Sequence, residues 1–144
     1  MLEYTKANLI NVMNAMQVIL PGYSLQLLSP CYQGHENNPM FGHCIHASEA
    51  IILLFPAEEF QLMRAKCEVA DYHWYLLDST GVIVDPTIDQ YYYAKIKPPY
   101  DKGKPQNRTY GRDSEWNDRY LSKSYFVKDK VIEYLTGGTL TFNN

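Results

Sequence analysis

Apolar side chains recur at helical spacing in two parts of the first half of the chain. Between residues 5 and 20 they approximate one stripe, which predicts a helix that Thr5 caps and that the proline–glycine pair at 21–22 stops. Residues 43–55 contain neither proline nor glycine and are dense in Ala, Ile and Leu. This composition predicts a buried helix with Cys44 in its first turn.

Segments rich in β-forming residues dominate the middle of the chain. They lie at residues 61–69, 72–77 and 82–84. The last two flank residues 78–81, Asp-Ser-Thr-Gly, which predict a hairpin turn with Gly81 in a left-handed conformation. A hairpin makes this part of the sheet antiparallel. A further short strand is expected at residues 23–28.

Two polar stretches predict loops. Residues 29–42 hold two prolines, two glycines and two asparagines. Residues 95–119 hold three prolines and two glycines and exceed the length of an ordinary connection, so we expect either a functional loop, such as a flexible lid, or partial disorder there. A closing helix should follow, with Ser122 or Ser124 as its N-cap and the glycine pair at 137–138 at its end. The whole pattern predicts an α+β fold in one domain, residues 1–144.

Composition narrows the classes of function. The 144 residues include 13 basic and 16 acidic side chains, for a formal net charge of −3, and 46% are apolar. This is enough apolar material for one core. The mild acidity disfavours nucleic acid as a partner, because binding to the phosphate backbone depends on clustered Lys and Arg. The first 20 residues lack the pattern of a signal peptide, and the longest apolar run, residues 50–57, is far shorter than the roughly 20 residues of a membrane helix. We therefore expect a cytoplasmic protein without a membrane partner.

Three cysteines, an odd number without CxxC spacing, disfavour a disulfide framework and a four-thiolate zinc site. A mixed zinc site is an alternative interpretation. Its ligands would come from His35, His43, Cys44 and His46, with Cys31 as a further thiol. These residues do not match a standard ligand spacing, so the prediction is that the protein uses neither a metal nor another cofactor.

One of the cysteines stands where a nucleophile is expected. Cys44 lies at a predicted loop-to-helix junction, where backbone N–H groups and the helix dipole stabilise a thiolate or an oxyanion. His73 lies in a predicted strand, and Asp85 ends the next strand of the same hairpin. If residues 78–81 form the turn, Asp85 can orient one imidazole nitrogen of His73 while the other nitrogen faces a thiol.

Each of these residues also has an ordinary structural explanation. Cys44 can be a small buried hydrophobe, His73 a hydrogen-bonded strand residue, and the Asp85-Pro86 pair simple turn chemistry. Independent core and turn residues would seldom produce this order and spacing together. The conjunction therefore favours a nucleophile, a base and an orienting carboxylate.

The same residues resemble a known family. A cysteine at a helix start, a His-Trp strand and a hairpin ending in Asp-Pro-Thr resemble the catalytic core of the transglutaminase-like proteins, within the papain-like class of cysteine hydrolases. Locally, residues 42–50 (GHCIHASEA), His73-Trp74 and residues 85–91 (DPTIDQY) are similar to the small bacterial and phage YunG-like family. The resemblance covers about residues 40–92. Ile45 follows the cysteine, whereas the transglutaminase type commonly has a bulky aromatic residue there.

The resemblance implies a catalytic triad of Cys44, His73 and Asp85 on an α+β fold, with the cysteine helix packed on an antiparallel sheet. It also calls for an oxyanion donor. The candidate donors are the backbone N–H of Cys44 and the side chain of Asn38, six residues before the cysteine. The sequence Asn-Asn-Pro around Asn38 is also typical of a turn. The other residues expected at the pocket are His43, Trp74 and Gln90.

Tyrosine is abundant, with 13 residues of which ten follow residue 71. Those at 91–93, with Tyr100, Tyr110 and Trp116, either cover a sheet edge or form the wall of a substrate groove. The function favoured is a cysteine hydrolase or acyltransferase that acts on an amide, isopeptide or thioester of a peptide or protein, by peptidase, deamidase or transglutaminase-like chemistry. The alternative is a non-catalytic module on the same fold that binds a protein or peptide. No oligomeric state follows from the sequence.

Overall fold

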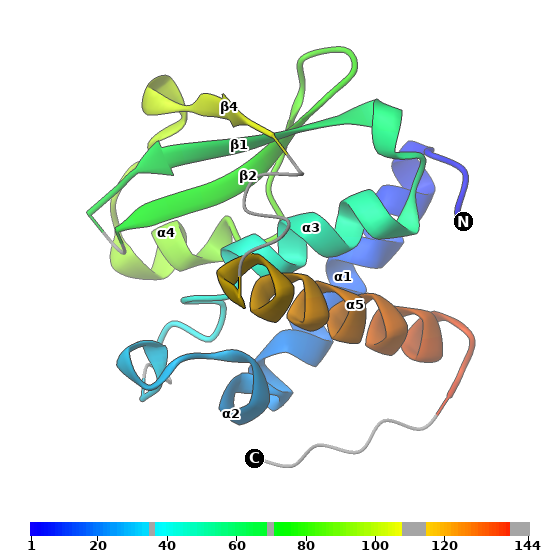
Figure 1. Cartoon of the computed structure of the whole chain (residues 1–144), viewed down its shortest axis with the longest axis horizontal. Helices are drawn as coiled ribbons and strands as arrows, with labels where there is room; N and C mark the ends of the chain where they lie inside the picture. Colours follow the sequence, from blue (N-terminus) through cyan, green and yellow to red (C-terminus); the bar gives the residue numbers. More distant parts are fainter. Residues whose placement is uncertain (35–36, 69–70, 108–114, 139–144) are drawn as a thin grey trace.

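The protein has an α+β fold. The computed structural model describes residues 1–34, 37–68, 71–107 and 115–138. Four antiparallel strands form one sheet, and helices cover one of its faces (Figure 1). Helix α3, Cys44–Leu54, contacts strands β1 and β2 on one side and helix α5, Glu115–Leu135, on the other. This position between two layers explains why α3 is apolar around most of its circumference.

Helix α1, Lys6–Gly22, begins as predicted, because the Thr5 side chain accepts a hydrogen bond of 3.1 Å from the backbone N–H of Asn8. It ends at the predicted proline–glycine pair, although it includes both residues and so extends two residues further than expected. Pro21 lies in the last turn, where its ring fixes a helical φ and only its own backbone hydrogen bond is missing. The expected strand at 23–28 is wrong. Residues Ser24–Leu27 form the short helix α2, because Leu27 N–H bonds locally to Tyr23 O at 3.0 Å.

The sheet has the order β3-β2-β1-β4, and its strands are Phe60–Lys66 (β1), Tyr72–Asp78 (β2), Ile83–Val84 (β3) and Lys104–Gln106 (β4). The predicted hairpin turn is confirmed, since Gly81 has φ +84° and Asp78 Oδ1 accepts the N–H groups of Thr80 and Val82 at 2.9 Å. The register pairs Leu76 with Val84, which leaves Asp85 just beyond the end of β3.

Residues 95–119 are not one continuous loop. Residues Tyr100–Lys102 form a 3₁₀ turn, and β4 adds a short edge strand to β1. Pro105 fits there because an edge strand does not need every N–H in the ladder. Helix α5 begins at Glu115, earlier than predicted, so Ser122 and Ser124 lie within the helix instead of capping it.

The C-terminus of α5 agrees with the sequence. Gly137 has φ +80°, and the N–H of Gly138 donates to Glu133 O at 2.7 Å, as expected of a glycine that ends a helix. A last short helix, α4, spans Asp89–Ala94. Within the described part of the chain, no helix has the length and apolar character needed to cross a membrane.

Candidate active site

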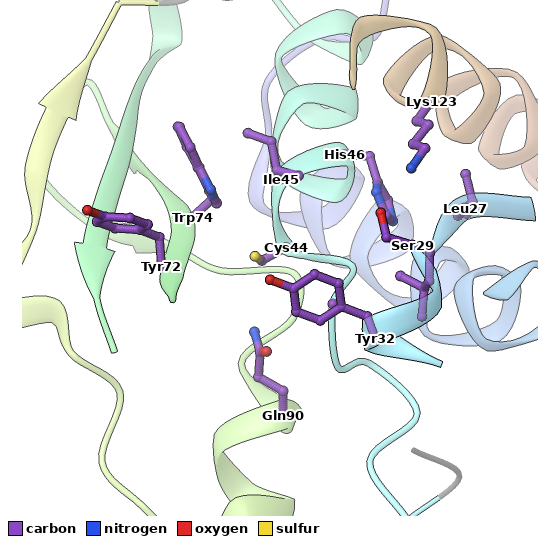
Figure 2. Close-up of a pocket in the computed structure, with 12 residues that line it drawn as sticks. Leu27, Ser29, Tyr32, Cys44, Ile45, His46, Tyr72, Trp74, Gln90 and Lys123 are labelled. Carbon is purple, nitrogen blue, oxygen red and sulfur yellow. The ribbon is translucent and has the colours of Figure 1, made fainter. Parts of the chain in front are cut away.

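Cys44 is the first residue of α3, and its side chain lies in a small pocket of about 80 Å³ (Figure 2). The turn before it depends on Gly42, which has φ +85° and whose missing Cβ would come within 3.0 Å of the Tyr32 side chain. The cysteine is 7% exposed. Backbone N–H groups at the start of a helix have no partner within the helix, so the sulfur lies at a site that favours negative charge.

His73 connects the cysteine to Asp85. Its ring is 1% exposed, and its Nε2 lies 2.7 Å from Asp85 Oδ2. The Cys44 thiol also interacts with the ring and, like Asp85, raises its pKa. The other ring nitrogen, Nδ1, lies 3.1 Å from the side-chain amide of Gln90. The structure thus brings together the three residues that the sequence suggested as a triad.

The environment of His73 favours its charged form. Burial alone would lower the pKa of the imidazole, but the hydrogen bonds and negative charges of Asp85 and Cys44 outweigh it and raise the pKa from 6.5 to about 10. The ring is therefore an imidazolium at neutral pH, next to a sulfur at a helix N-terminus. This is the electrostatic arrangement that stabilises a thiolate.

Asp85 is held from several directions. Its Oδ1 accepts the backbone N–H of Thr87 at 3.1 Å, and its Oδ2 accepts the hydroxyl of Tyr100 at 2.6 Å. The sequence had placed Tyr100 only among the tyrosines of a loop or lid. Burial and the negative charge of Asp85 raise the pKa of this phenol, which keeps it a proton donor. Nothing local in the sequence marks Tyr100, because its partner is 15 residues away and the contact depends on the position of the 3₁₀ turn.

Aromatic rings fix the orientation of the imidazole. Tyr75 stacks on His73 at 5.7 Å with an interplanar angle of 16°, and Tyr91 meets it edge-on at 4.7 Å and 79°. Tyr75 and Tyr91 are both almost fully buried. Tyr92 and Tyr93, by contrast, are 80% and 50% exposed, so the tyrosine run divides between the core and the surface. Tyr110 and the side chain of Trp116 lie outside the described residues.

Gln90 occupies the pocket, as the sequence suggested. Its Nε2 lies 3.1 Å from His73 Nδ1 and 3.0 Å from Thr87 Oγ1. Helix α4 positions it, because Gln90 lies in the first turn of α4, directly after the Asp85–Thr87 turn. The Gln90 amide therefore lies beside the imidazole nitrogen that Asp85 does not bind.

Asn38 is absent from the lining of the Cys44 pocket. Its Nδ2 donates to the backbone O of Gln90 at 2.8 Å, and the residue lines a neighbouring cavity instead of the Cys44 pocket. The expected role as oxyanion donor does not fit this geometry. A separation of six residues across a turn-rich loop does not determine where a side chain points, and here Asn38 supports the backbone of α4.

His43 is also not a pocket residue. It is fully buried, with Nδ1 2.7 Å from His46 Nε2 and Nε2 3.2 Å from Ser24 Oγ. His46, one helical turn later, lines the pocket in its place. Burial, with the nearby charge of Lys123, lowers the pKa of His43 to about 3 and that of His46 well below 6.5, so both rings are neutral.

The alternative zinc site has no geometric support in the described residues, where no three His, Cys, Asp or Glu side chains form a cluster that could hold a metal ion. His35 lies outside the described residues. Both ring nitrogens of His43 are already engaged, one by His46 and the other by Ser24. Of the other two cysteines, Cys31 is exposed and Cys67 is half-buried.

The pocket wall opposite α5 is aromatic. Trp74, as expected, lines it together with Tyr72, and both project from the same face of β2 (Figure 2). The guanidinium of Arg64 lies 4.3 Å from the centre of the Tyr72 ring and 5.6 Å from that of Trp74. This packing holds the two rings upright beside Cys44.

Comparisons with protein-family models, with curated proteins and with solved structures find no match for this chain.

Proposed function

We propose that this protein is a cysteine-dependent hydrolase or acyltransferase of papain-like, transglutaminase-like architecture, acting on an amide, isopeptide or thioester of a peptide or protein. One observation carries the proposal. A buried imidazole lies 2.7 Å from a buried carboxylate and also interacts with a thiol at the first residue of a helix. Structural histidines seldom need both partners, whereas a nucleophile and its base do.

The reaction follows from these contacts. In the resting state the proton of the Cys44 thiol already lies on His73, which is an imidazolium at neutral pH, and the sulfur attacks the carbonyl carbon of the substrate to form a C–S bond. The tetrahedral intermediate collapses as the C–N or C–S bond of the substrate breaks, and His73 returns the proton to the leaving group. Water or an amine then attacks the thioester, again with His73 as base, and releases Cys44.

The oxyanion of the tetrahedral intermediate needs hydrogen-bond donors that are available when the negative charge develops. The backbone N–H of Cys44 is one, because the first N–H groups of a helix lack partners in the helix. Gln90 supplies the second. A protonated Nδ1 of His73 cannot accept a hydrogen bond from this amide, so while the ring is an imidazolium the N–H of Gln90 is available to the developing oxyanion.

A second candidate function is a non-catalytic peptide-binding module. The small volume of the pocket, about 80 Å³, and the exposed rings of Tyr92 and Tyr93 favour it. In that case the Cys44 pocket is part of the core and the surface of α4 provides the contact.

Alkylation by iodoacetamide at pH 7, followed site by site with mass spectrometry, separates these functions. Burial alone predicts that exposed Cys31 reacts before buried Cys44. The catalytic proposal predicts the reverse order. It also predicts that His73→Ala slows the alkylation of Cys44 by at least about tenfold while leaving the alkylation rate of Cys31 unchanged. Slow labelling of Cys44, equal in the wild type and in His73→Ala, would favour the binding module.

A further inference from the structure

A second and larger cavity lies next to the Cys44 pocket. Its volume is about 480 Å³, against about 80 Å³ for the pocket that holds the sulfur. Leu28 and Tyr32 line both spaces and so form their common boundary. The pocket at the sulfur matches the size of a carbonyl group and its nearest atoms, whereas a bulky side chain beside that carbonyl finds room in the larger cavity.

The common boundary has a fixed position relative to the sulfur. The ring of Tyr32 packs against that of Phe41 with the ring centres 5.5 Å apart, and Figure 2 shows Tyr32 directed toward Cys44. The Cβ of Tyr32 lies so close to Gly42 that a Cβ added there would be 3.0 Å away. Because Gly42 belongs to the turn that leads into Cys44, a side chain bound against Tyr32 is placed at a defined distance from the nucleophile.

Hydrogen bonds from two residues of the cavity lining connect it to the site. Asn38 donates through Nδ2 to the backbone O of Gln90 at 2.8 Å. The Oγ of Ser24 lies 3.2 Å from Nε2 of His43, and Nδ1 of the same ring lies 2.7 Å from His46, which lines the pocket of the sulfur. The walls of the cavity are therefore held by the same network as the site, and a site supported in this way can select one side chain over another.

The lining of the cavity is mainly apolar. Among the described residues that form it, no side chain is charged, and most are apolar or aromatic, namely Pro21, Leu25, Leu28, Tyr32, Pro39 and Phe41. A volume of about 480 Å³ is within the range of about 300 to 1,000 Å³ that is typical of ligand sites. Leu25 of α2 is 56% exposed, so the cavity opens to solvent beside this residue.

We propose that this cavity is a specificity subsite for a large apolar side chain of the peptide substrate, on a residue within two positions of the bond that Cys44 attacks. The inference rests on the function proposed above, since it concerns the substrate of that site. A charged side chain would lose its hydration in this cavity without meeting a charge of opposite sign in the described lining. An apolar side chain, by contrast, is stabilised by its removal from water.

Matched alkylating probes test the subsite without a known substrate. N-iodoacetyl-leucine amide and N-iodoacetyl-asparagine amide have side chains of nearly equal shape and different polarity, and the same pair with an inserted glycine places these side chains one residue further from the reactive carbon. In each case the Cys44 sulfur displaces iodide, which leaves with the electron pair of the C–I bond as the C–S bond forms. The measured quantity is the ratio of the Cys44 alkylation rates for the leucine and the asparagine probe, divided by the same ratio for free N-acetylcysteine.

We expect the wild type to prefer the leucine probe by about tenfold at one of the two lengths or at both, which corresponds to about 1.4 kcal/mol of transition-state binding. Leu25→Ser and Leu25→Asp should each reduce this preference to below about threefold, because they place a polar group on the cavity wall. Leu25→Trp should reduce it as well, since the larger side chain fills the space. Val18→Asp is the matched control and should keep the full preference, because Val18 is 49% exposed on α1 and lines neither space.

The outcomes separate the two proposals. A Cys44 that reacts no faster than Cys31 with iodoacetamide overturns the catalytic function itself. A reactive Cys44 with a normalised ratio near one at both lengths, or with the same ratio in the wild type and in the Leu25 variants, overturns the subsite alone. Circular dichroism identifies any variant that is unfolded, and three different replacements of this exposed residue keep the comparison available if one of them does not fold.

Discussion

The hydroxyl of Tyr100 donates to Asp85 at 2.6 Å, and the oxygen that accepts it, Oδ2, is also the one that lies 2.7 Å from His73 Nε2. Two donors from different parts of the chain therefore meet on one carboxylate oxygen. Because Thr87 N–H binds the other oxygen at 3.1 Å, the carboxylate cannot rotate without losing a partner. The orientation of the His73 imidazole thus depends on the 3₁₀ turn that carries Tyr100.

Tyr100→Phe tests this dependence. Removal of the hydroxyl leaves Asp85 with one buried partner fewer, and a hydrogen bond to a charged group contributes about 1.5 to 3 kcal/mol. We expect the free energy of unfolding in urea to fall by an amount in this range and the alkylation of Cys44 to slow. Tyr75→Phe is the control, because the Tyr75 hydroxyl makes only a long contact of 3.4 Å to Tyr100 O. Equal losses for the two variants would contradict the role assigned to Tyr100.

The charge of Asp85 should determine the protonation of His73. In Asp85→Asn the shape of the side chain is kept and its charge is lost, so burial becomes the larger influence on the ring. We expect the pKa of His73 to fall from about 10 to below its ordinary value of 6.5, as measured by NMR titration of the ring. Asp101→Asn, at an exposed position, should leave the titration unchanged. A His73 that titrates near 10 in Asp85→Asn would show that its proton does not depend on the carboxylate.

The same shift has a consequence for stability. A group whose pKa is raised on folding stabilises the folded state fully below its unfolded value of 6.5, and this contribution disappears as the pH rises through the folded value of about 10. The free energy of unfolding of the wild type should therefore decline between pH 6.5 and 10. In Asp85→Asn the decline should be much weaker, and an unchanged slope would contradict the assigned ion pair.

The site residues that were predicted correctly from the sequence are those whose positions are determined by neighbouring residues in the chain. Cys44 follows a glycine that must adopt a positive φ, and the turn at 78–81 forces Asp85 back toward the beginning of the strand that carries His73. Gln90 follows within the next turns. Each of these positions depends on a few neighbouring residues, and those of Cys44 and Asp85 depend also on a glycine, which adopts a positive φ without steric cost.

The residues that were missed or misplaced depend on tertiary packing. Tyr100 reaches Asp85 only because β4 pairs with β1, and a three-residue edge strand containing a proline has almost no sequence signal. His43 and His46 differ by one helical turn, and the contact with Ser24 of α2 decides which of them turns away from the pocket. The sequence predicted a strand at that point, so this contact could not be anticipated.

The buried histidine pair should determine how the free energy of unfolding changes at acidic pH. His43 and His46 stay neutral in the folded protein, because burial lowers the pKa of both, whereas in the unfolded chain they take up protons near pH 6.5. Below that pH the unfolded state gains up to about 1.4 kcal/mol per histidine for each pH unit. The double variant His43→Gln/His46→Gln should thus lose less stability between pH 6.5 and 4 than the wild type does in urea unfolding. Parallel slopes for the two proteins would show that these rings are protonated in the folded state.

Gly103 should be required because of Tyr75, the ring that stacks on His73. Gly103 has φ −66° and ψ 138°, values that alanine adopts readily, so its backbone does not demand glycine. An added Cβ, however, would overlap the Tyr75 hydroxyl oxygen and lie 3.0 Å from Cζ of the same ring. Because Tyr75 is buried and rigid, Gly103→Ala should lower the free energy of unfolding by about 1 to 3 kcal/mol.

A double-mutant cycle isolates this contact. Tyr75→Phe removes the overlapping oxygen, so Gly103→Ala should cost at least about 1 kcal/mol less in the Tyr75→Phe background than in the wild type. The remaining cost reflects the approach of the new methyl group to Cζ and to the backbone O of Tyr100, 3.2 Å away. The alkylation rate of Cys44 should follow the same pattern, because a displaced Tyr75 leaves the stacked imidazole without support. Strictly additive effects on both stability and alkylation would contradict a direct contact between Tyr75 and residue 103.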